Sequence, residues 1–171
     1  GNRPSERSEQ VLLFEELVTS KGLPLYTLNY CQVVLAHRCV DVSDIARMQQ
    51  SVARLESMAA DLEADGGTRV CLRANRRNRS KLLVSCYATL LRLHLALQEF
   101  EALAALGLRC LRFADQLNFN AIDADTSYRL TRNILRVLQI NVLEAWFHGD
   151  ADLMQRTATA ITRVHDHCHR Q

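Results

Sequence analysis

Apolar residues recur every three or four positions along most of the chain, which is the spacing of one face of an α-helix. The pattern is clearest between residues 80 and 120, where one run includes Leu83 and Leu90 and a second run includes Leu103. Only the short link at residues 98–100 separates the two runs. Two helices joined so closely are predicted to form an antiparallel hairpin.

The same reading predicts seven helices and no strand. Gly22, the pair Gly66-Gly67 and Gly149 are helix stops, and Asp150 starts the last helix. Pro24 suits the first turn of the second helix. The expected helices lie near residues 8–20, 24–37, 45–65, 80–97, 100–117, 125–147 and from 150 into a polar tail.

Two helix starts have several candidate caps. Asp41 or Ser43 is expected to cap the third helix, with Asp44 in its first turn, and Asn78 or Ser80 is expected to cap the fourth. The resulting fold class is all-α, with about seven helices stacked as antiparallel hairpins.

The domain organisation follows from length and from the N-terminus. A chain of 171 residues fits one domain or a short array of repeats. We expect a disordered lead over residues 1–7 and a single helical-repeat-like domain over residues 8–171. The absence of a starting methionine suggests a fragment of a larger protein.

Composition narrows the class of protein. The chain is 48% hydrophobic and 23% charged, which is typical of globular proteins, and 2 prolines and 6 glycines are too few for a turn-rich β fold. No apolar run reaches the roughly 18–20 residues of a membrane span, so no membrane association is expected. Six cysteines without a CxxC pair suggest reduced thiols in the nucleus or cytoplasm.

A basic segment is the most concentrated charge in the chain, which has a formal net charge of only +2. It consists of Arg69, Arg73, Arg76, Arg77 and Arg79. Guanidinium groups suit phosphates and carboxylates alike, so an acidic partner segment, nucleic acid or plain solvent exposure would each explain it. The absence of interleaved aromatic residues favours the acidic partner or solvent over nucleic acid.

Several apolar residues exceed what one helix face would bury. They are Leu91, Leu95, Phe119, Ile140 and Phe147. Burial within a tight helical stack would account for them, and so would an interface with another chain. We therefore name them, with Arg73, Arg76, Arg77 and Arg79, as candidate partner-binding residues.

Two inter-helix turns carry a family resemblance. The stretch 100–114, with Phe100-Glu101-Ala102-Leu103 and Cys110-Leu111-Arg112-Phe113-Ala114, resembles a degenerate tetratricopeptide repeat, and the turn at residues 145–151 is similar. The two turns lie about 51 residues apart, beyond the roughly 34-residue period of that family. The resemblance covers about half the chain and implies a helical-repeat interaction scaffold with no assigned ligand site.

Candidate chemistry is sparse. His165, Cys168 and His169 could share a helix face, but zinc needs four ligands and no second cluster is visible, so no metal site is predicted. The sequence contains no GxSxG, HExxH, P-loop or GxGxxG motif, and no catalytic residue or cofactor is predicted.

The function expected from these observations is a non-enzymatic scaffold that binds a helical or extended acidic or apolar segment of another protein within a larger complex. The alternatives are a nucleic-acid-binding module that uses residues 69–79 and a helical dimerisation domain.

Overall fold

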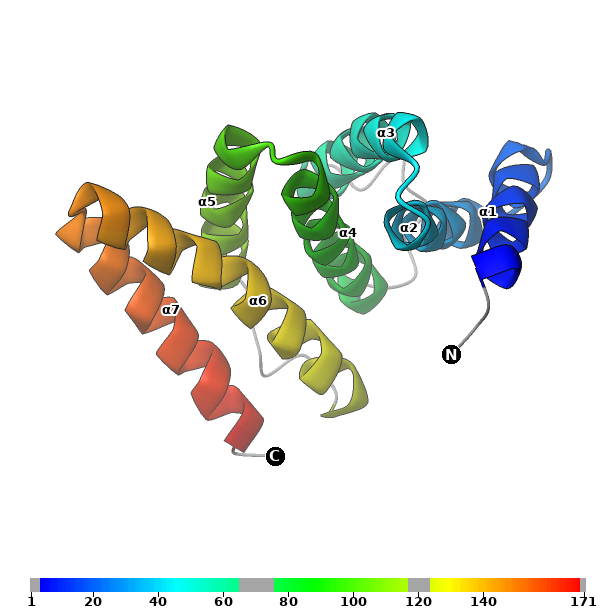
Figure 1. Ribbon diagram of the computed structural model, residues 1–171. Coiled ribbons are helices and arrows are strands. Elements are labelled where there is room, and N and C mark those ends of the chain that lie inside the picture. Colours follow the sequence, from blue (N-terminus) through cyan, green and yellow to red (C-terminus); the bar gives the residue numbers. More distant parts are fainter. Residues whose placement is uncertain (1–3, 65–75, 117–123, 170–171) are drawn as a thin grey trace. The chain divides into compact units, whose positions relative to one another are not determined.

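The computed structural model describes residues 4–64, 76–116 and 124–169, which form seven α-helices and no strand (Figure 1). The helices pack in sequence order, side by side, as antiparallel pairs, which confirms the predicted all-α class. They group into two compact units, residues 1–98 and 99–171. Each unit is described by itself.

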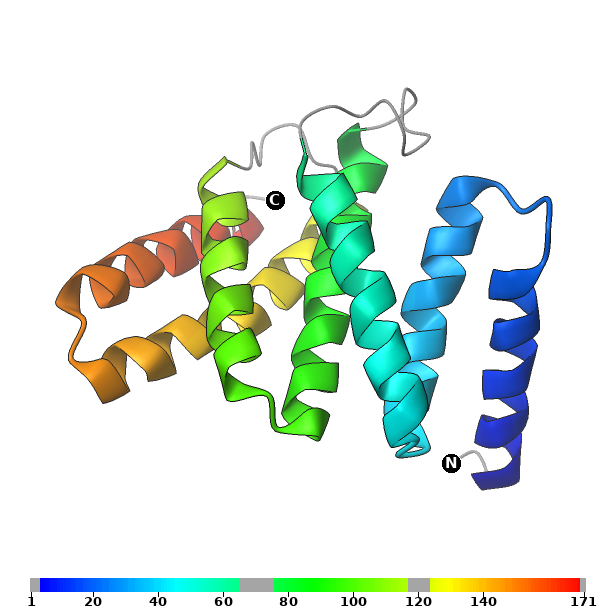
Figure 2. The same cartoon turned by 90° about the horizontal axis from the view of Figure 1, so that it is seen from above.

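Unit 1 contains four helices that run alternately up and down (Figure 2). Helix α2 packs against the other three, and α3 also packs against α4. Their bounds are α1 Pro4–Thr19, α2 Leu25–Asp41, α3 Ile45–Glu63 and α4 Arg76–Leu97.

The core of unit 1 is built mainly from α3 and α4. Leu55 and Leu62 of α3 and Leu83, Tyr87 and Leu90 of α4 are each at most 2% exposed. Burial of one such side chain contributes roughly 1.5–3 kcal/mol. The 3-4 spacing noted in the sequence therefore does mark the helix faces that meet.

Helix α4 is also long and apolar enough, between Arg79 and Leu97, to cross a membrane by length and composition. The sequence analysis found no such run because Arg92 and His94 interrupt it, although the average hydropathy tolerates them. Half of this window is buried inside the structure. A core helix passes the same test, and its place against α2 and α3 accounts for the apolarity of α4.

Unit 2 contains α5 (Phe100–Gln116), α6 (Ala124–His148) and α7 (Ala151–His169). Helix α6 packs against both neighbours, and α5 also contacts α7. The hairpin predicted over residues 80–120 is therefore divided between the units: α4 packs on α2 and α3, whereas α5 packs on α6.

Several helix ends differ from the prediction. Helix α1 begins at Pro4 rather than near Ser8, because proline is tolerated in a first turn. Helix α2 continues past His37 to Asp41. The last helix continues through the expected polar tail to His169.

The predicted caps also need correction. Helix α4 begins at Arg76, so Asn78 and Ser80 lie inside it. Asp44, expected in the first turn of α3, is itself the cap: its Oδ1 accepts a hydrogen bond from the Arg47 N–H at 3.0 Å. Asp150 caps α7 as predicted, accepting from the Leu153 N–H at 2.9 Å.

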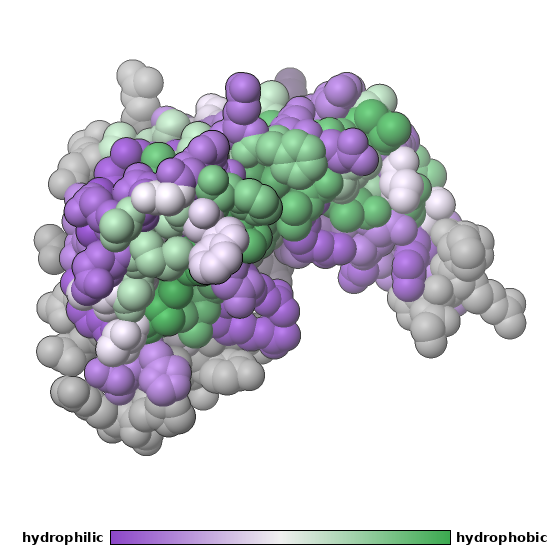
Figure 3. Space-filling model, turned by 60° about the vertical axis from the view of Figure 1, so that its left-hand side comes forward, coloured by the Kyte–Doolittle hydropathy of each residue, from purple (hydrophilic) through white to green (hydrophobic). Residues whose placement is uncertain are grey.

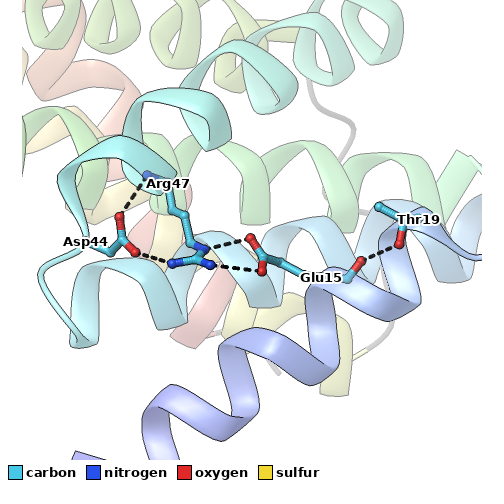
Figure 4. A network of polar contacts seen from close by, with 4 residues as sticks. All are labelled: Glu15, Thr19, Asp44 and Arg47. Atoms are coloured by element: carbon cyan, nitrogen blue, oxygen red, sulfur yellow. Dashed lines mark hydrogen bonds and ion pairs between the residues drawn. The ribbon is translucent and has the colours of Figure 1, made fainter.

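The side chain of Arg47 ties the start of α3 to α1 (Figure 4). Its Nε lies 2.6 Å from Glu15 Oε1, and its Nη1 lies 2.5 Å from Asp44 Oδ2. Hydrogen bonds from the Arg47 backbone and side chain lower the pKa of Asp44, and the bonds to Glu15 and Asp44 raise the pKa of Arg47. The network fixes the outermost helix of unit 1 to a helix that is not its chain neighbour.

Candidate functional site

Of the five arginines in the predicted basic segment, the structure describes one side chain, that of Arg79. Arg69 and Arg73 lie outside the described residues, and Arg76 and Arg77 begin α4 with side chains that also lie outside them. Arg79 is half-buried.

Arg79 covers the C-terminal end of α3. Its Nε donates to the Leu62 carbonyl at 2.5 Å, and its Nη2 donates to the carbonyls of Glu63 at 3.2 Å and Ala64 at 3.4 Å. The last carbonyls of a helix have no partner within the helix, and they carry the negative end of its dipole. Arg79 therefore has a structural role. The sequence analysis did not foresee this role and grouped Arg79 with the candidate partner-binding residues.

The predicted apolar contact residues fall in both units. On α4 in unit 1, Leu91 is half-buried and Leu95 is 54% exposed. On α6 in unit 2, Ile140 is half-buried and Phe147 is 78% exposed. Phe119 lies outside the described residues. The described candidates on α4 therefore belong to unit 1, and those on α6 belong to unit 2.

The end of α6 carries the most exposed apolar cluster. Leu143 is 59% exposed, Trp146 is 77% exposed and Phe147 is 78% exposed. Positions three and four apart on a helix are neighbours, so these side chains form one surface, which we call the α6 patch. Figure 3, which brings the left-hand side of Figure 1 forward, shows apolar side chains at the surface among polar ones.

Trp146, which the sequence analysis did not single out, is exposed because it lies off the buried face of α6. The buried positions Ile134, Leu138, Asn141 and Ala145 follow alternating steps of three and four residues. Trp146 is one residue beyond Ala145 and so is turned by about 100° from that face. A helical wheel centred on these positions would have found the patch.

Charged residues flank the α6 patch with opposite sign at its two sides. Arg132 and Arg136 are exposed on α6 before the patch, and no ion pair joins either of them to another residue in the described part of the chain. After the patch come Asp150 and Asp152, both exposed, and Glu144 lies beside it.

A pocket of about 190 Å³ lies on the other side of α6, within unit 2. At its rim the Glu144 carboxylate lies 3.3 Å from His148 Nε2. Its Asn141 side chain donates from Nδ2 to the Gly107 carbonyl at 2.9 Å, while its Oδ1 has no hydrogen-bond partner among the described residues. The pocket is lined by Ala104, Leu108, Asn141, Glu144, His148, Asp150 and Leu153.

A polar cluster in unit 1 joins α2 to α4. Arg92 Nη1 lies 2.5 Å from His37 Nδ1, and Arg92 Nη2 donates to Asp41 Oδ1 at 3.0 Å. Burial lowers the pKa of His37, and the Arg92 cation lowers it further. Burial raises the pKa of Asp41, but the bonds from Arg92 and Arg38 outweigh it and the pKa is lowered. His37 therefore accepts from Arg92 in its neutral form.

We expect acidification to weaken unit 1 through His37. Because the folded-state pKa lies below the ordinary value of 6.5, the unfolded chain takes up the proton first as the pH falls. The contribution is complete above about pH 6.5 and is lost as the pH falls toward the folded pKa. Urea unfolding should show a smaller fall in stability from about pH 7 to about pH 5 for His37→Asn, which keeps an acceptor at the Nδ1 position. The exposed control His165→Asn should keep the wild-type fall, and equal falls in all three proteins would contradict the prediction.

The described cysteines are not arranged for chemistry. Cys31, Cys39, Cys86 and Cys110 are buried and form no disulfide. Burial raises the pKa of Cys110 to about 12, and burial also raises the pKa of Cys39. A thiol with a raised pKa is a poor nucleophile at neutral pH, so Cys39 and Cys110 act as small apolar side chains.

The described side chains contain no group of three or more His, Cys, Asp or Glu that could hold a metal ion. His165 lies on α7, with Nδ1 3.9 Å from Asp166 Oδ1. The side chains of Cys168 and His169, the other members of the cluster weighed in the sequence analysis, lie outside the described set.

Comparisons with known proteins give no relative. No protein-family model, curated protein or solved structure matches the chain.

Proposed function

We propose that this chain is a non-enzymatic intracellular interaction module that docks another polypeptide through the α6 patch. The observation that carries the proposal is the exposure of Leu143, Trp146 and Phe147, each at least 59% exposed on one helix end. Large aromatic side chains dominate the binding energy of protein interfaces, and contiguous exposed apolar surface is typical of docking sites.

Stacked antiparallel helices support such a role because they hold a helix face rigid while a partner packs on it. The stretch 100–114 and the turn at residues 145–151 resemble tetratricopeptide repeats, and this resemblance also supports a helical-repeat interaction scaffold. The docking surface is placed on α6 rather than on the basic segment, because the one described arginine of that segment, Arg79, is bonded to the end of α3.

The proposal is tested by photo-crosslinking in cells that express the protein. A photoreactive residue is placed at Phe147, and at Thr162 of α7, exposed but polar, as a control. We expect nuclease-resistant adducts with a second polypeptide from position 147, and far fewer from position 162. The variant Trp146→Ser should reduce the adducts while leaving the circular dichroism spectrum unchanged, because Trp146 is 77% exposed.

Adducts with nucleic acid alone, or equal yields from both positions, would count against a docking surface on α6. In the first case the nucleic-acid alternative gains, and binding should then weaken with salt by about one log unit per log unit for each phosphate neutralised. Variants that test this alternative should replace the other arginines of the basic segment and keep Arg79, since the loss of Arg79 would disturb α3 as well.

A further inference from the structure

We infer that the pocket in unit 2 binds a primary alkylammonium group, the group found at the end of a lysine side chain and in a free aliphatic amine. The pocket lies on the other side of α6 from the α6 patch, so this site is additional to the proposed docking surface. Its hydrogen-bonding atoms, its charge and its apolar walls each favour this ligand.

The buried side of the pocket lacks a hydrogen-bond donor. Asn141 is 1% exposed, and its Nδ2 is already used by the Gly107 carbonyl at 2.9 Å. Its Oδ1 is buried and has no hydrogen-bond partner among the described residues. That oxygen overlaps the position that a Cβ of residue 107 would take, and residue 107 stands between Ala104 and Leu108, which line the pocket. A buried acceptor without a donor is unfavourable, so the pocket favours a ligand that brings an N–H group.

The charged groups of the pocket are acidic. Its lining includes the carboxylates of Glu144 and Asp150, and no lysine or arginine among the described residues. Glu144 Oε2 lies 3.3 Å from Nε2 of His148, which is charged only if protonated. Asp150 Oδ1 accepts from the Leu153 N–H, and no ion pair joins Asp150 to a cation in the described part of the chain. A concave site lined by charges of one sign concentrates ligands of the opposite sign, which here are cations.

The acceptors are placed to share one ammonium group. Asn141, Glu144 and His148 come three and four positions apart on α6, so their side chains are neighbours on one face of the helix. An ammonium group between Asn141 and Glu144 would donate to the amide oxygen and to the carboxylate, in place of the His148 ring. It carries three donors and no acceptor, which suits a site whose open atoms are acceptors. Asp150 adds a second negative charge from the start of α7.

The remaining walls suit an alkyl stem. Ala104 and Leu108 of α5 and Leu153 of α7 are aliphatic. The volume of about 190 Å³ is below the roughly 300–1,000 Å³ of sites for drug-sized ligands, so the pocket favours a single short chain. Lysine-like groups bury their methylene stem on apolar surface and keep the charged head among polar atoms.

Binding is tested by titrating the isotope-labelled whole chain with pentylamine at neutral pH and following the backbone amide resonances. We expect shifts at the residues that line the pocket, with a dissociation constant on the order of 1 mM for so small a ligand. Pentanol has the same stem without a charge, and pentanoate has the opposite charge. Both should bind about tenfold more weakly or worse, since neither gives a charge-assisted bond to Glu144. Equal binding of pentanol, or no shift at the lining residues with pentylamine, would overturn the site.

A second ligand distinguishes the source of the alkylammonium group. Lysine that is acetylated at its α-nitrogen and carries a methylamide presents the same group on a peptide unit. If it binds as well as pentylamine, the site accepts a lysine of another polypeptide. If pentylamine alone binds, the peptide unit does not fit and the ligand is a free amine. Both results support an alkylammonium site.

Matched variants separate the pocket from net charge. Glu144→Gln keeps the size of the side chain and removes its charge, so pentylamine should bind about tenfold more weakly. Glu16→Gln, at an exposed position of α1 in unit 1, removes the same charge and should leave the affinity unchanged. His148→Lys places an ammonium group of the chain four residues after Glu144 and should prevent pentylamine from binding. Equal weakening by Glu144→Gln and Glu16→Gln would show attraction to net charge alone and would also overturn the site.

Discussion

Replacing Tyr87 by alanine is expected to lower the free energy of unfolding of unit 1 by about 3–5 kcal/mol, the usual effect of removing a buried aromatic ring. Tyr87 is 1% exposed and lies in the α3–α4 core. Its hydroxyl donates to Glu63 Oε1 at 2.8 Å. Urea unfolding followed by far-ultraviolet circular dichroism measures the loss, because the single tryptophan is in unit 2 and would not report it.

Two companion variants divide this effect into its parts. Tyr87→Phe keeps the ring and removes one hydrogen bond, so it should cost about 1 kcal/mol. Glu63 is exposed and regains water when the bond is lost, which keeps the value low. Tyr30→Ala, at a position 53% exposed on α2, is the control and should cost less than about 1 kcal/mol. A loss as small as this in Tyr87→Ala would mean that the ring does not support the core.

Gly107→Ala is expected to destabilise unit 2, although alanine is normally the better helix residue. A Cβ at position 107 would overlap the Asn141 side-chain oxygen and approach its Cγ to 3.1 Å. Overpacking of about 1–3 kcal/mol opposes a helix-propensity gain of roughly 1 kcal/mol, so a net loss of up to about 2 kcal/mol is expected. Thermal unfolding of the variant and the wild type measures it.

A double-mutant cycle gives this prediction its control. Asn141→Ala removes the side chain that the new methyl group would strike, so Gly107→Ala should be neutral or stabilising in that background. The Gly107 carbonyl loses only the extra bond from Asn141, whose own replacement should cost about 1 kcal/mol. Equal effects of Gly107→Ala in both backgrounds would show that the two residues are not in contact.

The helices could be predicted where the sequence contains its own stop signals. The expected helix over residues 125–147 is α6 at 124–148, because Gly149 adopts a positive φ of 65° and Asp150 caps the next helix. The start of α4 could not be predicted, because the basic segment before it contains no breaker. The end of α2 was missed for the same reason, since its turn uses Ser43 at a positive φ of 57° instead of a glycine.

Residue roles at the candidate site depended on contacts between distant segments. Arg79 and Leu62 are far apart in sequence, and nothing local shows that one guanidinium would cover the end of the other helix. Phe147 was singled out because helix α6 has more apolar residues than one face can bury. Trp146, next to it, was not singled out, because spacing alone does not show which of two overlapping apolar stripes faces the neighbouring helices.

The close approach of Gly107 and Asn141 also determines how α5 and α6 can slide against each other. Asn141 is 1% exposed, and its side-chain amide donates a hydrogen bond to the Gly107 carbonyl. One turn along α5 in either direction stand Leu103 and Leu111, both buried, whose side chains would occupy the space that the amide needs. A buried amide without a hydrogen bond is strongly unfavourable, and a single buried asparagine fixes the alignment of helices in coiled coils. The pair therefore selects one axial register for unit 2 among the several that its leucine-rich faces would otherwise accept.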